Sequence, residues 1–190
     1  MRAAGQGDRT AFDCLVDRHV QALVNFFYRH TWSQTLSEDL AQDCFVRIWQ
    51  ASETYEPSAK FTTWMFRIAR NLWIDHHRRQ SREKPSVSLN APMGNDETDS
   101  LAGRIKDDST LPPDEIHSRT EIAGDLMAAI DTLSDDHKTV FLLSVMHGLK
   151  YNEIADALDL PLGTVKSRMF HSINRLRELL SGTEFDPDKR

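Results

Sequence analysis

The sequence of 190 residues contains little cysteine and no long apolar run. Two cysteines cannot form the disulfide framework of a small secreted domain, and Cys14 and Cys44 both lie in amphipathic helical patterns that predict small core residues. No apolar stretch is long enough to span a membrane. The opening residues, MRAAGQGDRTAFDCLV, contain no apolar signal core. We therefore expect a cytoplasmic protein without membrane insertion.

Aromatic residues are missing from the middle of the chain: none of the sixteen lies between Ile74 and Val140. Four of the seven prolines and the polar stretch NAPMGNDETDS fall in the same region. Such a segment cannot bury much apolar surface and is typical of a linker. The predicted organisation is a first domain at 1–80, an acidic, proline-containing linker at 81–119, a second domain at 120–182 and a tail at 183–190.

Strand-like alternation is also absent, whereas apolar residues recur at helical spacing. The predicted fold class is all-α, with two small helical domains, a helical bundle and a helix-turn-helix, joined by a flexible linker. In the first domain we expect one buried stripe of Phe12, Leu15, Val16, His19, Val20, Leu23, Val24 and Phe27. A second helix, from about residue 36 to 52, is expected to bury Leu40, Cys44, Phe45, Ile48 and Trp49. His19 is interpreted as a packed histidine, not as a ligand.

Charge is distributed unevenly along this acidic chain, whose formal net charge is −6. Residues 96–136 contain twelve acids and three bases. In contrast, residues 61–79 and 161–180 each have a net charge of +3. Two basic helices separated by an acidic segment indicate a nucleic-acid partner more strongly than the total charge argues against one.

The segment from Tyr151 to Leu180 has the spacing of a helix-turn-helix. Ala155 is the small residue where two helices cross, Asp159 lies at the turn, and Val165 is the apolar residue that packs the second helix against the first. Glycine is usual at the turn, and aspartate tolerates the left-handed conformation better than most residues. On the second helix we expect six residues to face inward, Leu162, Val165, Met169, Ile173, Leu176 and Leu180. The exposed side is expected to show Ser167, Phe170, His171 and Asn174, with Lys166 at its edge.

The segment FTTWMFRIARNLWIDHHRR, residues 61–79, divides into two faces when placed on a helix. Core packing explains one stripe, Phe61, Trp64, Met65, Ile68 and Leu72. The opposite side carries Phe66, Arg70, Trp73 and His77, flanked by Arg67, Asn71 and Arg78. Aromatic rings interleaved with Arg and Asn suit single-stranded nucleic acid, because bases stack on the rings and arginines hold phosphates. An interface for another protein domain explains this side equally well.

Taken in order, these segments resemble an extracytoplasmic-function (ECF) sigma factor of the sigma-70 family. The resemblance is carried by AFDCLVDRHV, EDLAQDCFVRIWQ, FTTWMFRIARNLWIDHHRR and LSDDHKTVFLLSVMHGLKYNEIADALDLPLGTVKSRMFHSINRLRELL. It implies two sigma domains, σ2 and σ4. Its implied partners are core RNA polymerase, through the clamp helices of the largest subunit and the flap region, promoter DNA, and an anti-sigma factor.

The resemblance also implies three groups of site residues. The group facing the −10 element is Phe66, Arg67, Arg70, Asn71, Trp73, Arg78 and Arg79, with Asn71 beside the flipped base. The group reading the −35 duplex is Lys166, Ser167, Arg168, Phe170 and His171. The group docking on RNA polymerase is Asp39, Gln42, Asp43, Arg47 and Gln50.

Two other classes of protein are alternatives to this interpretation. An autonomous two-domain helix-turn-helix regulator would bind its operator without polymerase, but it does not account for the aromatic face that carries Asn71. A metal-dependent nuclease would need clustered carboxylates or histidines, and the acids concentrate in the linker. The adjacent His76 and His77 point to different helix faces. We therefore expect no enzyme activity, no catalytic residue, no metal site and no cofactor.

Overall fold

The computed structural model describes residues 1–53, 55, 60–83 and 124–181. The first part of the chain forms four helices, α1 (Arg2–Gly5), α2 (Arg9–Thr31), α3 (Gln34–Gln50) and α4 (Phe61–Glu83). Residues 124–131 are also helical and are followed by α6 (Asp135–Val145), α7 (Tyr151–Leu158) and α8 (Leu162–Leu180). No strand occurs in these described ranges, which confirms the all-α prediction. We call the described residues up to 83 the N-terminal unit and residues 124–181 the C-terminal unit.

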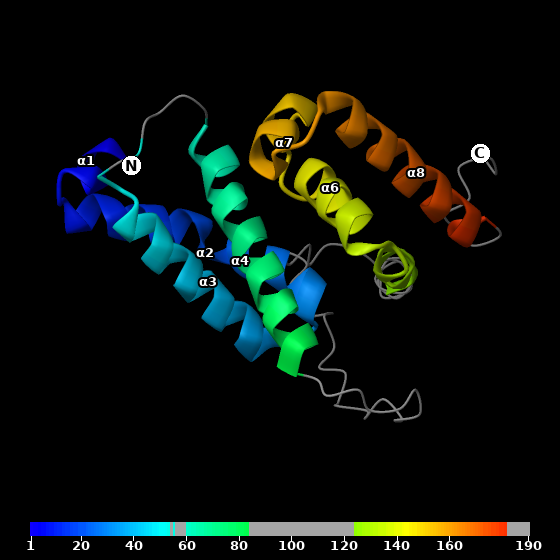
Figure 1. Ribbon diagram of the computed structural model, residues 1–190, viewed down its shortest axis with the longest axis horizontal. Coiled ribbons are helices and arrows are strands. Elements are labelled where there is room, and N and C mark those ends of the chain that lie inside the picture. Colours follow the sequence, from blue (N-terminus) through cyan, green and yellow to red (C-terminus); the bar gives the residue numbers. More distant parts are fainter. Residues whose placement is uncertain (54, 56–59, 84–123, 182–190) are drawn as a thin grey trace, which may run out of the picture.

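Local capping signals define the antiparallel pair of α2 and α3 (Figure 1). The side chain of Asp8 accepts a hydrogen bond from the Ala11 amide at 3.0 Å at the start of α2. Trp32 ends this helix in the left-handed conformation, with φ of 53°. Ser33 then caps α3 by accepting from the Leu36 amide at 3.4 Å. A two-residue connection therefore reverses the chain and brings the apolar faces of the two helices together.

The core of the N-terminal unit lies where α2, α3 and α4 meet. Leu23, Phe27, Cys44, Ile48 and Met65 are all fully buried there. Burying each large apolar side chain contributes about 1.5–3 kcal/mol to stability. This core fixes α4 against α2 and α3.

The C-terminal unit is a helix-turn-helix built on α6. Asp159 ends α7 with φ of 53°, so the left-handed turn expected at this residue is confirmed. Val140 of α6, Ile154 of α7 and Val165 of α8 are fully buried together. The tight turn at Asp159 thus places α8 across the other two helices with its polar side outward.

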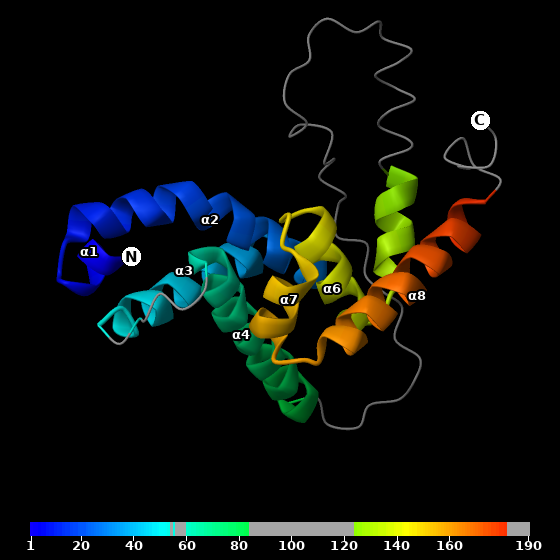
Figure 2. The ribbon, with the colours of Figure 1, turned by 90° about the horizontal axis from the view of Figure 1, so that it is seen from above.

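The two units pack against each other, with α4 between α3 and α7 (Figures 1 and 2). The buried apolar side chains of both units form one continuous cluster. A segment that follows α4 by more than 40 residues in the sequence therefore covers part of its surface.

Several local expectations differ from the structure. The second helix begins at Gln34 and ends at Gln50, two residues earlier than expected at each end. Cys14 is exposed, which overturns its prediction as a core residue, whereas Cys44 is buried and burial raises the pKa of its thiol to about 12. Leu162 and Ile173 are also exposed, because the crossing helices cover a narrower stripe of α8 than the apolar pattern suggests.

The predicted domain boundaries are only partly within the described residues. Helix α4 continues to Glu83, past the boundary expected at residue 80. The remainder of the predicted linker, 84–119, and the tail at 183–190 lie outside the described residues. Across the described ranges, no helix has both the length and the apolar character needed to cross a membrane. The same ranges hold no cluster of three or more side chains suited to a metal ion.

Candidate nucleic-acid interface

The polar side of α4 presents a row of cationic and amide side chains. Arg67, Asn71, Arg78 and Arg79 are exposed, and Arg70 is half-buried. The Arg70 guanidinium lies 3.5 Å from the amide oxygen of Asn71, at the outer limit of a hydrogen bond. Asn71 therefore keeps its amide group accessible for the edge of a base, with arginines on both sides for phosphates.

The two aromatic residues expected on the free side of α4 are buried. Phe66 is 2% exposed and Trp73 is 8% exposed. The Phe66 ring lies 5.6 Å from Phe26 of α2 and 4.6 Å from His147, which connects α6 to α7. Trp73 packs 5.1 Å from the ring of His30. The prediction of a solvent-exposed aromatic face is therefore wrong for this arrangement of the chain, because side chains of both units cover it.

Polar contacts between the units accompany the aromatic ones. The Arg67 guanidinium donates to the backbone carbonyl of Asp156 through Nε at 3.1 Å and through its terminal nitrogen at 2.5 Å. Lys60 pairs with Glu153 at 2.7 Å, and this cation lowers the pKa of the Glu153 carboxyl. His30 Nδ1 lies 3.8 Å from the carboxylate of Asp135, beyond hydrogen-bond distance.

A small cleft lies between the units beside this interface. Its walls combine cationic residues of both units with the two acids that begin α6. The lining includes Arg70, His77, Arg78, Asp135, Asp136 and Arg168. The cleft therefore places carboxylates of the C-terminal unit among arginines that were predicted to hold DNA.

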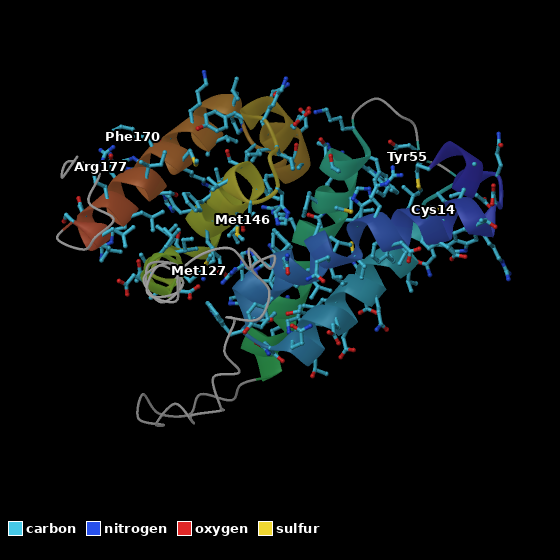
Figure 3. All side chains as sticks on the ribbon, turned by 180° about the vertical axis from the view of Figure 1, so that it is seen from behind. Cys14, Tyr55, Met127, Met146, Phe170 and Arg177 are labelled. Atoms are coloured by element: carbon cyan, nitrogen blue, oxygen red, sulfur yellow. The ribbon has the colours of Figure 1, made fainter. Side chains whose placement is uncertain are left out.

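The outer side of α8 is open to solvent. Lys166, Ser167 and His171 are exposed, and Phe170 is 61% exposed on the side of the helix away from the N-terminal unit (Figure 3). Arg168 differs, because it pairs with Asp136 at 2.6 Å and is only 21% exposed. An exposed aromatic ring among cationic and hydroxyl side chains suits the major groove of a DNA duplex.

The outer face of α3 presents the third group of predicted residues. Asp39, Gln42, Asp43 and Gln50 are exposed, whereas Arg47 is half-buried and pairs with Asp75 of α4 at 3.5 Å.

Sequence reasoning missed Val46, which is 53% exposed on the same face of α3. Its spacing of three from Asp43 and four from Gln50 was the signal that could have identified it. An apolar side chain among exposed polar ones is a common feature at the centre of a protein-docking face.

Comparison with known proteins agrees with this division of the chain. Residues 15–83 match the family model of sigma-70 region 2, and residues 123–176 match that of sigma-70 region 4. The ECF RNA polymerase sigma factor SigW of Bacillus subtilis is 33% identical over 175 residues, which cover 92% of this chain and 91% of SigW.

Two solved structures share the fold. One is CnrH in complex with the cytosolic domain of CnrY, with a TM-score of 0.65 at 24% identity, covering 96% of this chain and 95% of that one. The other is the sigma factor RpoE of Bartonella quintana in complex with the anti-sigma factor NepR. Its TM-score is 0.65 at 23% identity, and it covers 92% of this chain and 99% of that one. Both sigma regions occur in order, and the described residues of each form a helical unit. The protein belongs to the ECF sigma factors of the sigma-70 family.

Proposed function

We propose that this chain binds core RNA polymerase and directs it to promoters by reading a −35 duplex and capturing the opened −10 element. The observation that carries the proposal is the pair of basic helix faces on α4 and α8, one in each matched sigma region. The chain contributes binding energy, and polymerase performs the chemistry. Because the net charge is −6 and phosphate contacts dominate DNA affinity, the free chain should bind promoters weakly.

Helix α4 is proposed to capture the −10 element of the promoter. Asn71 contacts the edge of an unstacked base, while Arg67, Arg70, Arg78 and Arg79 hold the backbone. Phe66 and Trp73 supply stacking surface once they are uncovered. Each stacked base contributes about 1–3 kcal/mol, which together with base capture and polymerase contacts offsets the few kcal/mol lost when a base leaves the duplex.

Helix α8 is proposed to read the −35 element of the promoter. Lys166, Ser167, Phe170 and His171 lie on its accessible side, where an α-helix enters the major groove. Arg168 joins them by exchanging its ion pair with Asp136 for a phosphate. The family often has arginine at the position of His171, so a histidine here predicts a weaker or different contact.

Polymerase docks on the outer face of α3. Asp39, Gln42, Asp43, Arg47 and Gln50 provide polar contacts with the clamp helices of the largest subunit, and Val46 provides an apolar centre. The C-terminal unit reaches the flap region. The chain associates with the nucleoid only as part of this holoenzyme.

An anti-sigma factor is the proposed regulator of this chain. Support comes from the RpoE relative of like fold, whose structure contains the anti-sigma factor NepR. Such a regulator would compete with polymerase or DNA for the same faces.

Reconstituted transcription tests the proposed function. Core polymerase with this protein should produce discrete 5′ ends from a library of genomic fragments, and core alone should not. These ends identify the promoters for later assays. A tight, sequence-specific DNA complex formed without polymerase would instead identify an autonomous regulator and overturn the proposal.

A further inference from the structure

We infer that His137 of α6 is a positioning residue for −35 recognition, which holds the imidazole of His171 on α8 where a base edge of the duplex can reach it. This inference rests on the proposed function, because it concerns the accessible side of α8. His137 lies before the helix-turn-helix of α7 and α8, and none of the predicted site groups includes it. It acts on DNA recognition through His171 and does not itself touch the duplex.

The first turn of α6 is attached to α8 by two polar contacts. The Asp136 carboxylate pairs with Arg168 at 2.6 Å, and the backbone carbonyl of His137 accepts from the Ser172 hydroxyl at 3.4 Å. Ser172 is fully buried. These contacts hold residues 168 and 172, one helical turn apart, against α6, and His171 lies between them in the sequence. The backbone that carries His171 is therefore fixed relative to His137.

The ring of His137 is held by the residue that precedes α6. Its Nδ1 lies 2.8 Å from the hydroxyl oxygen of Ser134. A hydroxyl can rotate to donate or to accept, so this hydrogen bond forms with either neutral tautomer of the imidazole. His137 is half-buried, and the two residues that follow it, Lys138 and Thr139, are buried. The ring therefore has little freedom to turn away from α8.

The ring of His171 contacts two neighbouring rings. Its centroid lies 6.3 Å from that of His137 and 5.7 Å from that of Phe170, with interplanar angles of 78° and 74°. Edge-to-face contacts of this kind are an arrangement that aromatic rings prefer. His171 is nevertheless exposed, and Phe170 projects from the outer side of α8 (Figure 3). His137 thus supports, from another helix, an imidazole that remains open to DNA.

An imidazole held in one orientation can distinguish base pairs. The major groove presents a different pattern of donors and acceptors at each base pair, and a neutral imidazole has one donor and one acceptor nitrogen. A side chain that is already in its bound orientation loses less conformational freedom on binding. Placement by His137 should therefore increase both the affinity and the base selectivity of the His171 contact.

A groove beside these rings shows what the His137 ring prevents. The groove has a volume of about 590 Å³ and lies between the start of α6 and the outer side of α8, with His137 and His171 in its lining. Asn174 and Glu178 also line it and offer acceptors for an imidazole N–H. Removal of the His137 ring widens the groove next to His171. The imidazole can then turn toward these acceptors and away from the duplex.

Binding of the holoenzyme to −35 duplexes tests this role. Each duplex carries one changed base pair of a −35 element from the promoters that the fragment library identifies. His171→Ala locates the base pair at which discrimination depends on the imidazole. His137→Ala should reduce discrimination at that base pair at least about fivefold and leave the others unchanged, and adding His171→Ala should reduce it no further. Thr132→Ala, which shortens another side chain in the groove, is the control and should change nothing.

A conservative variant separates positioning from stability. His137→Phe keeps a ring next to His171 and should retain discrimination within about twofold of the unmodified protein. A loss as large as that of His137→Ala would overturn the inference, because a ring in this place would then not position His171.

Three other results would overturn the inference alone. The first is an equal loss of affinity at every base pair in His137→Ala, which would indicate a general structural role. The second is discrimination that His171→Ala removes and His137→Ala leaves intact. The third is a His171→Ala variant that discriminates as well as the unmodified protein. If the unmodified holoenzyme binds all the −35 duplexes equally, the proposed reading of the −35 element is refuted instead.

Discussion

The imidazole of His147 lies against the phenyl ring of Phe66, with 4.6 Å between ring centroids and 45° between ring planes. The two residues belong to different units of the chain and are separated by the predicted linker. Phe66 would be a stacking surface for DNA in the proposed function, and His147 is a titratable group that covers it. This contact therefore connects the arrangement of the units with both DNA binding and pH.

Acidification should favour separation of the units. Burial lowers the pKa of His147 from 6.5 to about 4. Because the buried imidazole resists protonation, its contribution to the closed arrangement is complete above about pH 6.5 and declines as the pH falls toward about 4. Within this window the ratio of closed to separated chains should fall by up to about tenfold per pH unit.

Energy transfer between dyes measures this effect. Dyes on cysteines at Gln80 of α4 and Glu178 of α8, both exposed, should move apart between about pH 7.5 and about pH 5.5. His147→Gln is the control and should reduce the pH response. Glu153 stays ionised across this range of pH, because Lys60 lowers the pKa of its carboxyl. An unchanged response in His147→Gln would show that His147 does not control separation.

Asn71→Ala should impair promoter opening without loss of polymerase binding. The exposed amide is proposed to contact a base that has left the stack, so its removal should reduce opening by about tenfold or more. Permanganate reactivity of unpaired thymines measures opening, and competition for core polymerase measures docking. Gln80→Ala, an equally exposed amide further along α4, should be neutral. Loss of polymerase binding by Asn71→Ala would instead indicate a structural role.

Lys166→Ala should weaken −35 engagement and reduce its salt dependence. Removing one phosphate contact lowers the slope of log affinity against log salt concentration by about 1. Binding of the holoenzyme to a duplex with only the −35 element measures both effects. Arg18→Ala removes a positive charge from an exposed position on α2 and should change neither. Identical slopes for the two variants would remove Lys166 from the site.

Val46→Asp should weaken binding to core polymerase by about tenfold, since it places a charge at the apolar centre of the proposed docking face. Val20 was expected on the buried stripe of α2 but is 37% exposed, so Val20→Asp introduces the same change at an exposed valine and serves as the control. Competition between each variant and the unmodified protein for a limited amount of core polymerase measures the effect. Equal competition by both variants would show that polymerase does not contact Val46.

Local chemistry explains why much of this fold could be predicted from the sequence. The helices follow from apolar spacing and from caps such as Asp8 and Ser33, which act within a few residues. The left-handed turn at Asp159 is likewise a local property of the aspartate side chain. Exposed Phe170 could be predicted because the buried stripe of α8 left it on the outer side.

Contacts between distant segments decided the rest. The sequence by itself determined that α4 has an apolar stripe and an aromatic-basic side. For the aromatic-basic side it was compatible with two partners, single-stranded nucleic acid and another protein domain. Only the tertiary structure placed His147 over Phe66 and Asp156 against Arg67, across a long separation in the chain. Helical periodicity specifies which residues share a face, but what covers that face depends on the free energy of packing against a remote element. For the same reason, Cys14 and Leu162, both expected to face the core, are exposed, because no remote element covers them.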